Sequence, residues 1–172
     1  GEKENDISFS VGWALANSHK FLDIFLKLVI GWNNKYSPDD ILVRLQRHES
    51  EGGFTDFEIE YPGYFHLIIE AKKGWNFPGA YQLTKYAKRV NFKKSNAKIK
   101  KILVLSESSH EYAHAHFKIS RVEDIDVETI SWKDFYNYSK KAMVGGSNAE
   151  KRLLIELNKY LESIMTMQNK DS

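Results

Sequence analysis

The chain contains no cysteine among its 172 residues. This absence excludes a disulfide framework and every metal site that depends on thiolate ligands. Proteins that work in oxidising compartments commonly carry disulfides, whereas a chain without cysteine fits a reducing one. We therefore expect an intracellular protein and a cytoplasmic location.

Long apolar runs are also missing. The longest, at residues 21–32, is interrupted by Asp23 and Lys27 and is too short to cross a bilayer. The first residues, GEKEND, are charged, and no apolar core with a cleavage site follows them. The sequence therefore predicts no membrane partner and no secretory signal.

The composition indicates one ordinary globular domain over residues 1–172. Hydrophobic residues make up 42% and charged residues 28% of the chain, and no internal repeat or low-complexity tract occurs. The missing initiating Met and the polar end at residues 169–172 suggest a chain trimmed from a longer protein. An additional domain and a homodimer both stay open as expectations.

The formal net charge is only +2, but charges of one sign are absent from two stretches. Residues 49–60 contain five acidic and no basic side chains, and residues 84–101 contain eight basic and no acidic side chains. A basic stretch can bind the phosphate backbone of a nucleic acid, and it can equally be a solvated helix face. An acidic stretch beside it suits a cation held next to a phosphate.

A β-hairpin organises the middle of the chain. Residues 54–60 and 66–72 alternate apolar and polar side chains, and Pro62-Gly63 supplies turn chemistry between them. For a hairpin centred near residue 63, facing positions sum to about 126, which places Asp56 opposite Glu70. Lys72 projects from the same face as Glu70 because strand side chains alternate.

Two facing carboxylates repel each other unless a cation lies between them. Carboxylate oxygens are hard ligands that suit Mg²⁺ or Mn²⁺. An ammonium group beside such a cation can orient or deprotonate a water molecule that attacks phosphorus. The hairpin therefore indicates phosphodiester hydrolysis. The alternative is a solvated strand face on which Glu70 and Lys72 pair only casually.

These residues resemble the signature of the PD-(D/E)xK nuclease superfamily. Asp56 is followed, after thirteen intervening residues, by Glu70-Ala71-Lys72, and Thr55 stands where the motif has proline. Residues 82–86, QLTKY, resemble the QxxxY motif of the RecB-like and phage-exonuclease branches. The resemblance implies a restriction-endonuclease-like α/β fold, with an αβββαβ core over about residues 2–132 and a mixed central sheet flanked by helices. Residues 133–172 would form a C-terminal helical extension.

The resemblance also implies a ligand set. Asp56, Glu70 and the Ala71 carbonyl would bind Mg²⁺ (or Mn²⁺), and Lys72 would position the attacking water. Many members carry an acidic residue on the first core helix, which here corresponds to Glu4, with Glu2 as an alternative. A carboxylate at a helix start is equally explained by the helix dipole.

A helix expected at or after Pro78 carries Gln82 and Tyr86 four residues apart on one face. The resemblance implies that both orient the phosphate, although Tyr86 could also be an aromatic at the edge of the core. Trp75 and Phe77, in the connection before this helix, could stack on a splayed base or cap the core. The basic residues expected to hold the DNA backbone are Lys73, Lys85, Lys88, Arg89, Lys93 and Lys94.

The remaining elements follow from periodicity and capping signals. We expect two helices or one kinked helix within residues 2–31, with the break near Asn17-Ser18. A strand is expected at 41–48, although Ser37-Pro38 could also open a short helix. Further on we expect a buried strand at 102–106, a helix at 109–117, a strand at 127–132, a capping-box helix at 131–141 and a last helix from Ser147. His110 and His114 lie four apart, but without an H-E-x-x-H pattern they do not indicate zinc.

The function expected from these features is a metal-dependent deoxyribonuclease with a role in defence, restriction or repair. Its catalytic residues would be Asp56, Glu70, Lys72, Gln82 and Tyr86. The alternative is a catalytically silent module of the same fold that binds nucleic acid or a protein partner. The intact Asp, Glu and Lys favour the enzyme.

Overall fold

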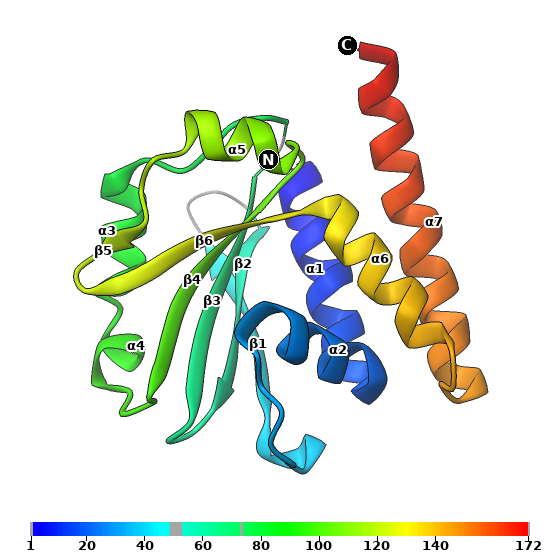
Figure 1. Cartoon of the computed structure of the whole chain (residues 1–172), viewed down its shortest axis with the longest axis horizontal. Coiled ribbons are helices and arrows are strands. Elements are labelled where there is room, and N and C mark those ends of the chain that lie inside the picture. The colour runs from blue at the N-terminus through cyan, green and yellow to red at the C-terminus, as the bar shows by residue number, and fades with distance from the viewer. Residues whose placement is uncertain (1, 49–52, 73, 172) are drawn as a thin grey trace.

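The computed structural model describes the backbone of residues 2–48, 53–72 and 74–171, and the side chains of residues 7–45, 56–72 and 74–164. The described residues form a mixed six-stranded sheet with helices on both faces (Figure 1). The α/β class and the mixed sheet flanked by helices are thereby confirmed, while the nuclease fold itself stays a prediction. Among the described residues, none of the helices has both the length and the apolar character needed to cross a membrane.

The chain begins with two helices, α1 (Glu2–Asn17) and α2 (His19–Ile30). They separate at Ser18, as predicted, because Ser18 adopts an extended backbone and its hydroxyl accepts a hydrogen bond from the Phe21 amide at 3.1 Å. Gly31 ends α2 with a φ of +66°, a left-handed conformation that favours glycine. The caps at Ser18 and Gly31 therefore set the two ends of α2.

Three antiparallel strands follow a short 3₁₀ turn (Pro38–Asp40). These are β1 (Leu42–His48), β2 (Gly53–Tyr61) and β3 (Phe65–Lys72). The turn between β2 and β3 closes with Gly63 at a φ of +86° and a hydrogen bond from the Tyr64 amide to the Tyr61 carbonyl at 2.8 Å. Asp56 pairs with Glu70, so the predicted register is confirmed.

The rest of the chain extends the sheet from β3. Helices α3 (Ala80–Ala87) and α4 (Val90–Lys94) lead into β4 (Ile99–Ser106), which runs parallel to β3. Helix α5 (His110–His116) and the short β5 (Arg121–Val122) precede β6 (Ile125–Ser131), which is parallel to β4. The sheet order is β1-β2-β3-β4-β6-β5. Helices α6 (Trp132–Met143) and α7 (Asn148–Asp171) end the described chain, and the predicted capping box at Ser131 and Asp134 opens α6.

Each face of the sheet has its own apolar core. The larger core packs the sheet against α1, α2, α6 and α7, and the smaller one packs it against α3 and α4 (Figure 1). On β2, Phe57 and Ile59 enter the larger core, so the alternating Asp56, Glu58 and Glu60 face the smaller one. The polar face of the hairpin is therefore covered by α3 and α4.

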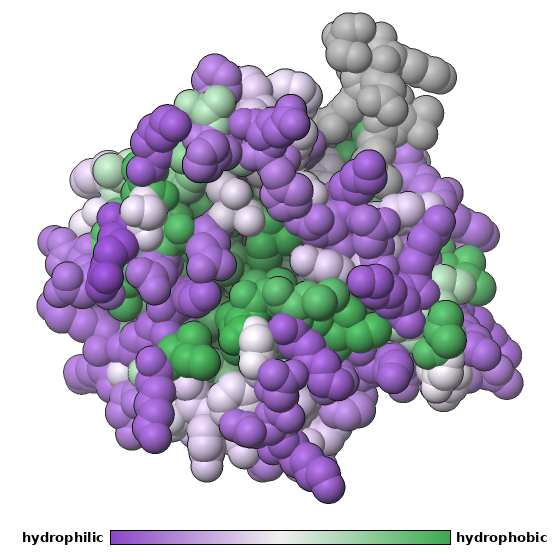
Figure 2. Space-filling view, in the orientation of Figure 1, coloured by the Kyte–Doolittle hydropathy of each residue, from purple (hydrophilic) through white to green (hydrophobic). Residues whose placement is uncertain are grey.

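The surface seen in Figure 2 is mostly hydrophilic, and its apolar residues gather near the middle, around the position of α2 in Figure 1. Leu28 on α2 is one of the exposed apolar side chains. The polar groups that need an explanation lie instead beneath α3 and α4.

Candidate functional site

Two buried carboxylates form the centre of the candidate site. Asp56 on β2 and Glu70 on β3 are register partners whose exposed fractions are 0% and 1%. Directly facing residues of an antiparallel pair project to the same side, here toward α3. Burying two carboxylates is costly unless each is compensated by a positive charge or by hydrogen-bond donors.

The closest positive charge and hydrogen-bond donor lie at one oxygen of Glu70, and the Tyr86 hydroxyl also stabilises its ionised form. Its Oε1 accepts a hydrogen bond from Gln82 Nε2 at 2.7 Å and lies 3.4 Å from the Lys72 ammonium. Its Oε2 is buried without a hydrogen-bond partner among the described residues. Burial raises the pKa of Glu70 to about 7 against the opposing effects of Lys72 and Tyr86, with the Asp56 charge adding to the rise. The ionised form of Glu70 is therefore short of positive charge at Oε2.

Asp56 is compensated from the helical layer. Nη1 of Arg89, which follows α3, donates to Asp56 Oδ2 at 2.6 Å and lies 3.9 Å from Glu58 Oε1. The same guanidinium lies over the Tyr86 ring, 4.5 Å from its centroid. We expected Arg89 at the DNA backbone. The structure places it on a carboxylate that we expected to bind metal.

Gln82 and Tyr86 lie on one face of α3, as predicted, and both approach Glu70. Gln82 Nε2 lies 3.2 Å from the Tyr86 hydroxyl, within hydrogen-bond distance. The Tyr86 ring is buried in the smaller core. Burial, Glu70 and Asp56 raise the pKa of Tyr86 far above its usual value, so its hydroxyl remains a proton donor at any physiological pH. Tyr86 is thus both a core aromatic and a member of the site.

The donor set fits a hard divalent cation. Asp56 and Glu70 supply carboxylate oxygens, and Glu70 Oε2 is a buried oxygen without a hydrogen-bond partner among the described residues. Ala71 follows Glu70 on β3, and its carbonyl stays a predicted ligand. Among the described residues, no group of three or more His, Asp or Glu side chains is arranged to hold a metal. Glu2 and Glu4 lie on α1, but their side chains are outside the described residues, so their contribution stays a prediction.

The basic stretch divides into two groups. Lys85, Lys88, Lys93 and Lys94 are exposed on and beside α3 and α4. Lys100 and Lys101 have partners within the protein: Lys100 Nζ donates to the Phe92 carbonyl at 2.8 Å, and Lys101 Nζ lies 2.8 Å from Glu128. Lys73 lies outside the described residues. The exposed lysines, to which Lys98 between α4 and β4 also belongs, are available to a polyanion.

A second buried polar cluster lies further along the hairpin, and the sequence reasoning missed it. His66 is fully buried, with Nε2 3.6 Å from Glu58 Oε1 and Nδ1 3.7 Å from Glu60 Oε2. Arg44 on β1 lies 3.5 Å from Glu58 and 2.7 Å from Glu60. Burial would raise the pKa of Glu58, but His66, Arg89 and Arg44 together lower it. The signal was available, because the register that pairs Asp56 with Glu70 also pairs Glu60 with His66.

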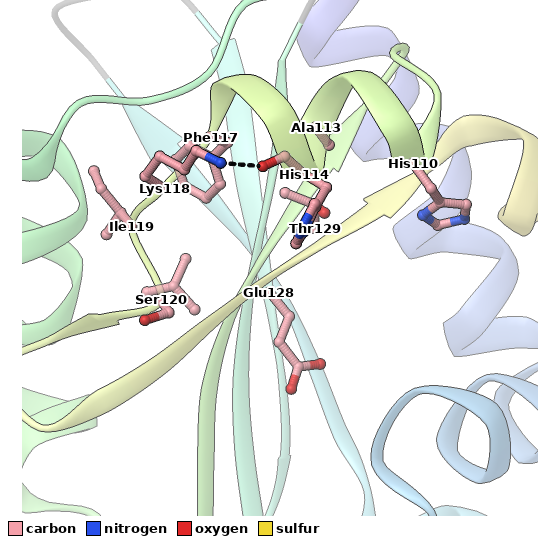
Figure 3. A pocket seen from close by; sticks show the side chains of 10 residues that line it. His110, Ala113, His114, Phe117, Lys118, Ile119, Ser120, Glu128 and Thr129 are labelled. Atoms are coloured by element: carbon pink, nitrogen blue, oxygen red, sulfur yellow. Dashed lines mark hydrogen bonds between the residues drawn. The ribbon is translucent and has the colours of Figure 1, made fainter.

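A pocket of about 560 Å³ lies between α5 and β6 (Figure 3). His110 and His114 both line it, but in Figure 3 the His110 ring points away from the other lining side chains. His110 Nε2 lies 2.9 Å from Asp134 Oδ2, and Lys118 Nζ donates to the His114 carbonyl at 2.9 Å. The pocket shares no lining residue with the carboxylate site.

No protein-family model matches this chain, and searches of curated proteins and of solved structures found no significant match either.

Proposed function

We propose that the protein is a metal-dependent nuclease that hydrolyses phosphodiester bonds in DNA with Mg²⁺ or Mn²⁺. The observation that carries the proposal is the convergence on Glu70. Asp56 faces it across the hairpin, Lys72 and Gln82 lie at 3.4 Å and 2.7 Å from its Oε1, and its Oε2 lacks a described partner. A buried carboxylate pair with one adjacent lysine is suited to hydrolysis at phosphorus.

In this proposal Asp56, Glu70 and the Ala71 carbonyl hold the cation, which when bound polarises the phosphate and acidifies a water molecule. Lys72 has no lone pair for a metal while it is protonated, so it orients or deprotonates that water from beside Glu70. Gln82 keeps the Glu70 carboxylate oriented. Tyr86, as a neutral phenol, can donate to the phosphate.

The strand arrangement supports a restriction-endonuclease-like core. Three antiparallel strands lead through helices to a parallel fourth strand, with α1 packed on the opposite face. That is the αβββαβ order which the PD-(D/E)xK resemblance implies. The exposed lysines of α3 and α4 supply charge for the DNA backbone. The resemblance implies a role in defence, restriction or repair, and the absence of cysteine fits the cytoplasmic location that we propose.

One observation favours a second candidate function, a catalytically silent module that binds nucleic acid or a protein. Arg89 already neutralises Asp56 through an ion pair at 2.6 Å. A protein that keeps the fold without hydrolysis would need such an internal cation, because an uncompensated buried carboxylate destabilises the fold. In the enzyme, Asp56 would have to exchange Arg89 for the metal.

The test is cleavage of plasmid, single-stranded DNA and RNA in Mg²⁺, in Mn²⁺ and in EDTA. Lys72→Ala should lower the cleavage rate by roughly two to four orders of magnitude, the usual worth of a positioned acid–base group. Lys101→Ala is the matched control, since Lys101 is as buried as Lys72 (21% against 22% exposed) and also pairs with a glutamate. If the wild type cleaves none of these substrates with either metal, the binding module is the better assignment.

A further inference from the structure

A cluster of aromatic rings lies at the sheet edge where β3 and β4 end. Lys72 and Ser106 are register partners on these parallel strands, so the segments that follow them leave from the same edge. Trp75 follows β3, and Tyr112 and His116 lie on α5, which follows β4. The Trp75 and Tyr112 ring centroids are 4.4 Å apart, and those of Tyr112 and His116 are 4.1 Å apart.

The cluster has an anchored inner part and an accessible outer part. Phe77 and Phe117 stack at 5.0 Å and pack against the smaller core, so they hold the cluster in place. Trp75 is 51% exposed, His116 is exposed and Tyr112 is half-buried. Packing against the core accounts for Phe77 and Phe117, but it does not account for Trp75, half of whose surface is exposed to water.

We propose that Trp75, Tyr112 and His116 form a platform on which an unpaired base of the substrate stacks. The inference rests on the proposed function and deepens it, because it names the substrate class: nucleic acid with unpaired bases, such as single strands, flaps and frayed ends. Aromatic side chains beside a basic surface bind single strands with little sequence preference, since every base has a π face. A base inside a continuous duplex cannot present that face.

The position of the platform relative to Lys72 supports the assignment. Trp75 leaves the sheet just after Lys72, whose ammonium lies 3.4 Å from Glu70 Oε1. The rings share the sheet face of the carboxylates, because Phe77 and Phe117 pack against the smaller core. In this proposal a base next to the phosphate bound at the carboxylates stacks on them. The exposed lysines of α3 and α4 supply the phosphate contacts that such a strand also needs.

The experiment measures binding of a fluorescently labelled single strand and of a labelled, covalently closed circular duplex, which has neither ends nor loops, in EDTA so that neither is cut. Trp75→Ala should weaken binding of the single strand roughly ten- to a hundredfold and change duplex binding by less than about twofold. Trp75→Phe, which keeps a ring, should recover most of the loss. The matched control is Trp13→Ala: Trp13 is 50% exposed and stacks on Phe9 at 6.1 Å, on α1 across the sheet.

The outcomes separate this inference from the proposed function. If the wild type cleaves DNA and Trp75→Ala binds both probes as tightly as the wild type, the platform is wrong and the nuclease stands. An equal loss for both probes also overturns it, because it shows no preference for unpaired bases. If the wild type neither binds nor cleaves nucleic acid, both proposals fall. Should Trp75→Ala fail to fold, the exposed His116→Ala carries the same test with a smaller expected loss.

Discussion

Protonation of Glu70 should control metal binding at the candidate site. Burial raises the pKa of this carboxyl to about 7, and a divalent cation binds only its ionised form. At about pH 6 roughly one molecule in ten carries an ionised Glu70, so Mg²⁺ affinity should fall about tenfold for each pH unit below 7. At about pH 8 Glu70 is ionised and the affinity should reach a plateau.

Titration calorimetry in two buffers of different ionisation enthalpy measures this coupling directly. Close to one proton should be released per Mg²⁺ bound at about pH 6, and almost none at about pH 8. Glu70→Gln should abolish both the binding of Mg²⁺ and the proton release. The control is Glu60→Gln, on the face of β2 that also carries Asp56, which should leave both intact. An Mg²⁺ affinity that is constant across this range would refute the assignment of Glu70 as a ligand.

The same pKa makes a prediction about stability without metal. A carboxyl whose pKa is higher in the folded than in the unfolded protein adds its full share to the unfolding free energy at any pH below the unfolded-state pKa. This share is lost as the pH rises toward and through the folded-state pKa. The rise from 4.5 to about 7 corresponds to about 3 kcal/mol of unfolding free energy, lost between those pH values. Glu70→Gln cannot ionise, so urea denaturation should find it more stable than the wild type at pH 8 by up to this amount.

Three further predictions concern the surrounding charges and the helix cap. Arg89→Gln removes the ion pair to the fully buried Asp56 and should lower the unfolding free energy by about 3 kcal/mol. The same change should raise the affinity for Mg²⁺, because Arg89 no longer competes with the cation for Asp56. An unchanged Mg²⁺ affinity would exclude this competition. Replacing Lys85, Lys88, Lys93 and Lys94 by Gln should reduce the slope of log DNA affinity against log salt by about 0.9 for each phosphate that the protein no longer neutralises, with Lys101→Gln as the control that leaves the slope intact. Ser18→Ala removes the N-cap of α2 together with the hydroxyl's hydrogen bond to Glu150 Oε2, and should cost about 1 to 2 kcal/mol in urea denaturation. Glu150→Gln, which leaves the cap intact, should cost less; an unchanged stability of Ser18→Ala would argue against the cap.

The parts of the fold that could be predicted depend on local chemistry. The strand period and the Pro62-Gly63 turn determine the hairpin register, and the register alone places Asp56 opposite Glu70. The helix break at Ser18 and the capping box at Ser131 are likewise determined by residues near in sequence. These predictions needed no knowledge of how the helices pack.

The position of Arg89 could not be predicted in the same way. It depends on where α3 ends and on how the helix docks over the sheet, and it joins residues 33 positions apart. A run of basic residues also gives no sign of which members turn inward, as Lys100 and Arg89 do, and which stay in solvent. The division of the short α4 from α3 at Lys88 was missed for the same reason, since neither proline nor glycine marks it.

The two polar clusters beneath α3 and α4 share residue types but differ in how their charge is compensated. Glu58 and Glu60 are bridged by Arg44 and flanked by His66, and the pKa of Glu58 is lowered as a result. Glu70 has one lysine at 3.4 Å and a raised pKa, whereas Arg44, His66 and Arg89 all lie within 4 Å of Glu58. Both clusters lie on one face of one hairpin, so burial alone does not distinguish them. The missing positive charge is at Glu70, and that is where an external cation would lower the free energy most. In the proposed function it is therefore the Asp56–Glu70 pair, and not the Glu58 cluster, that would bind the metal.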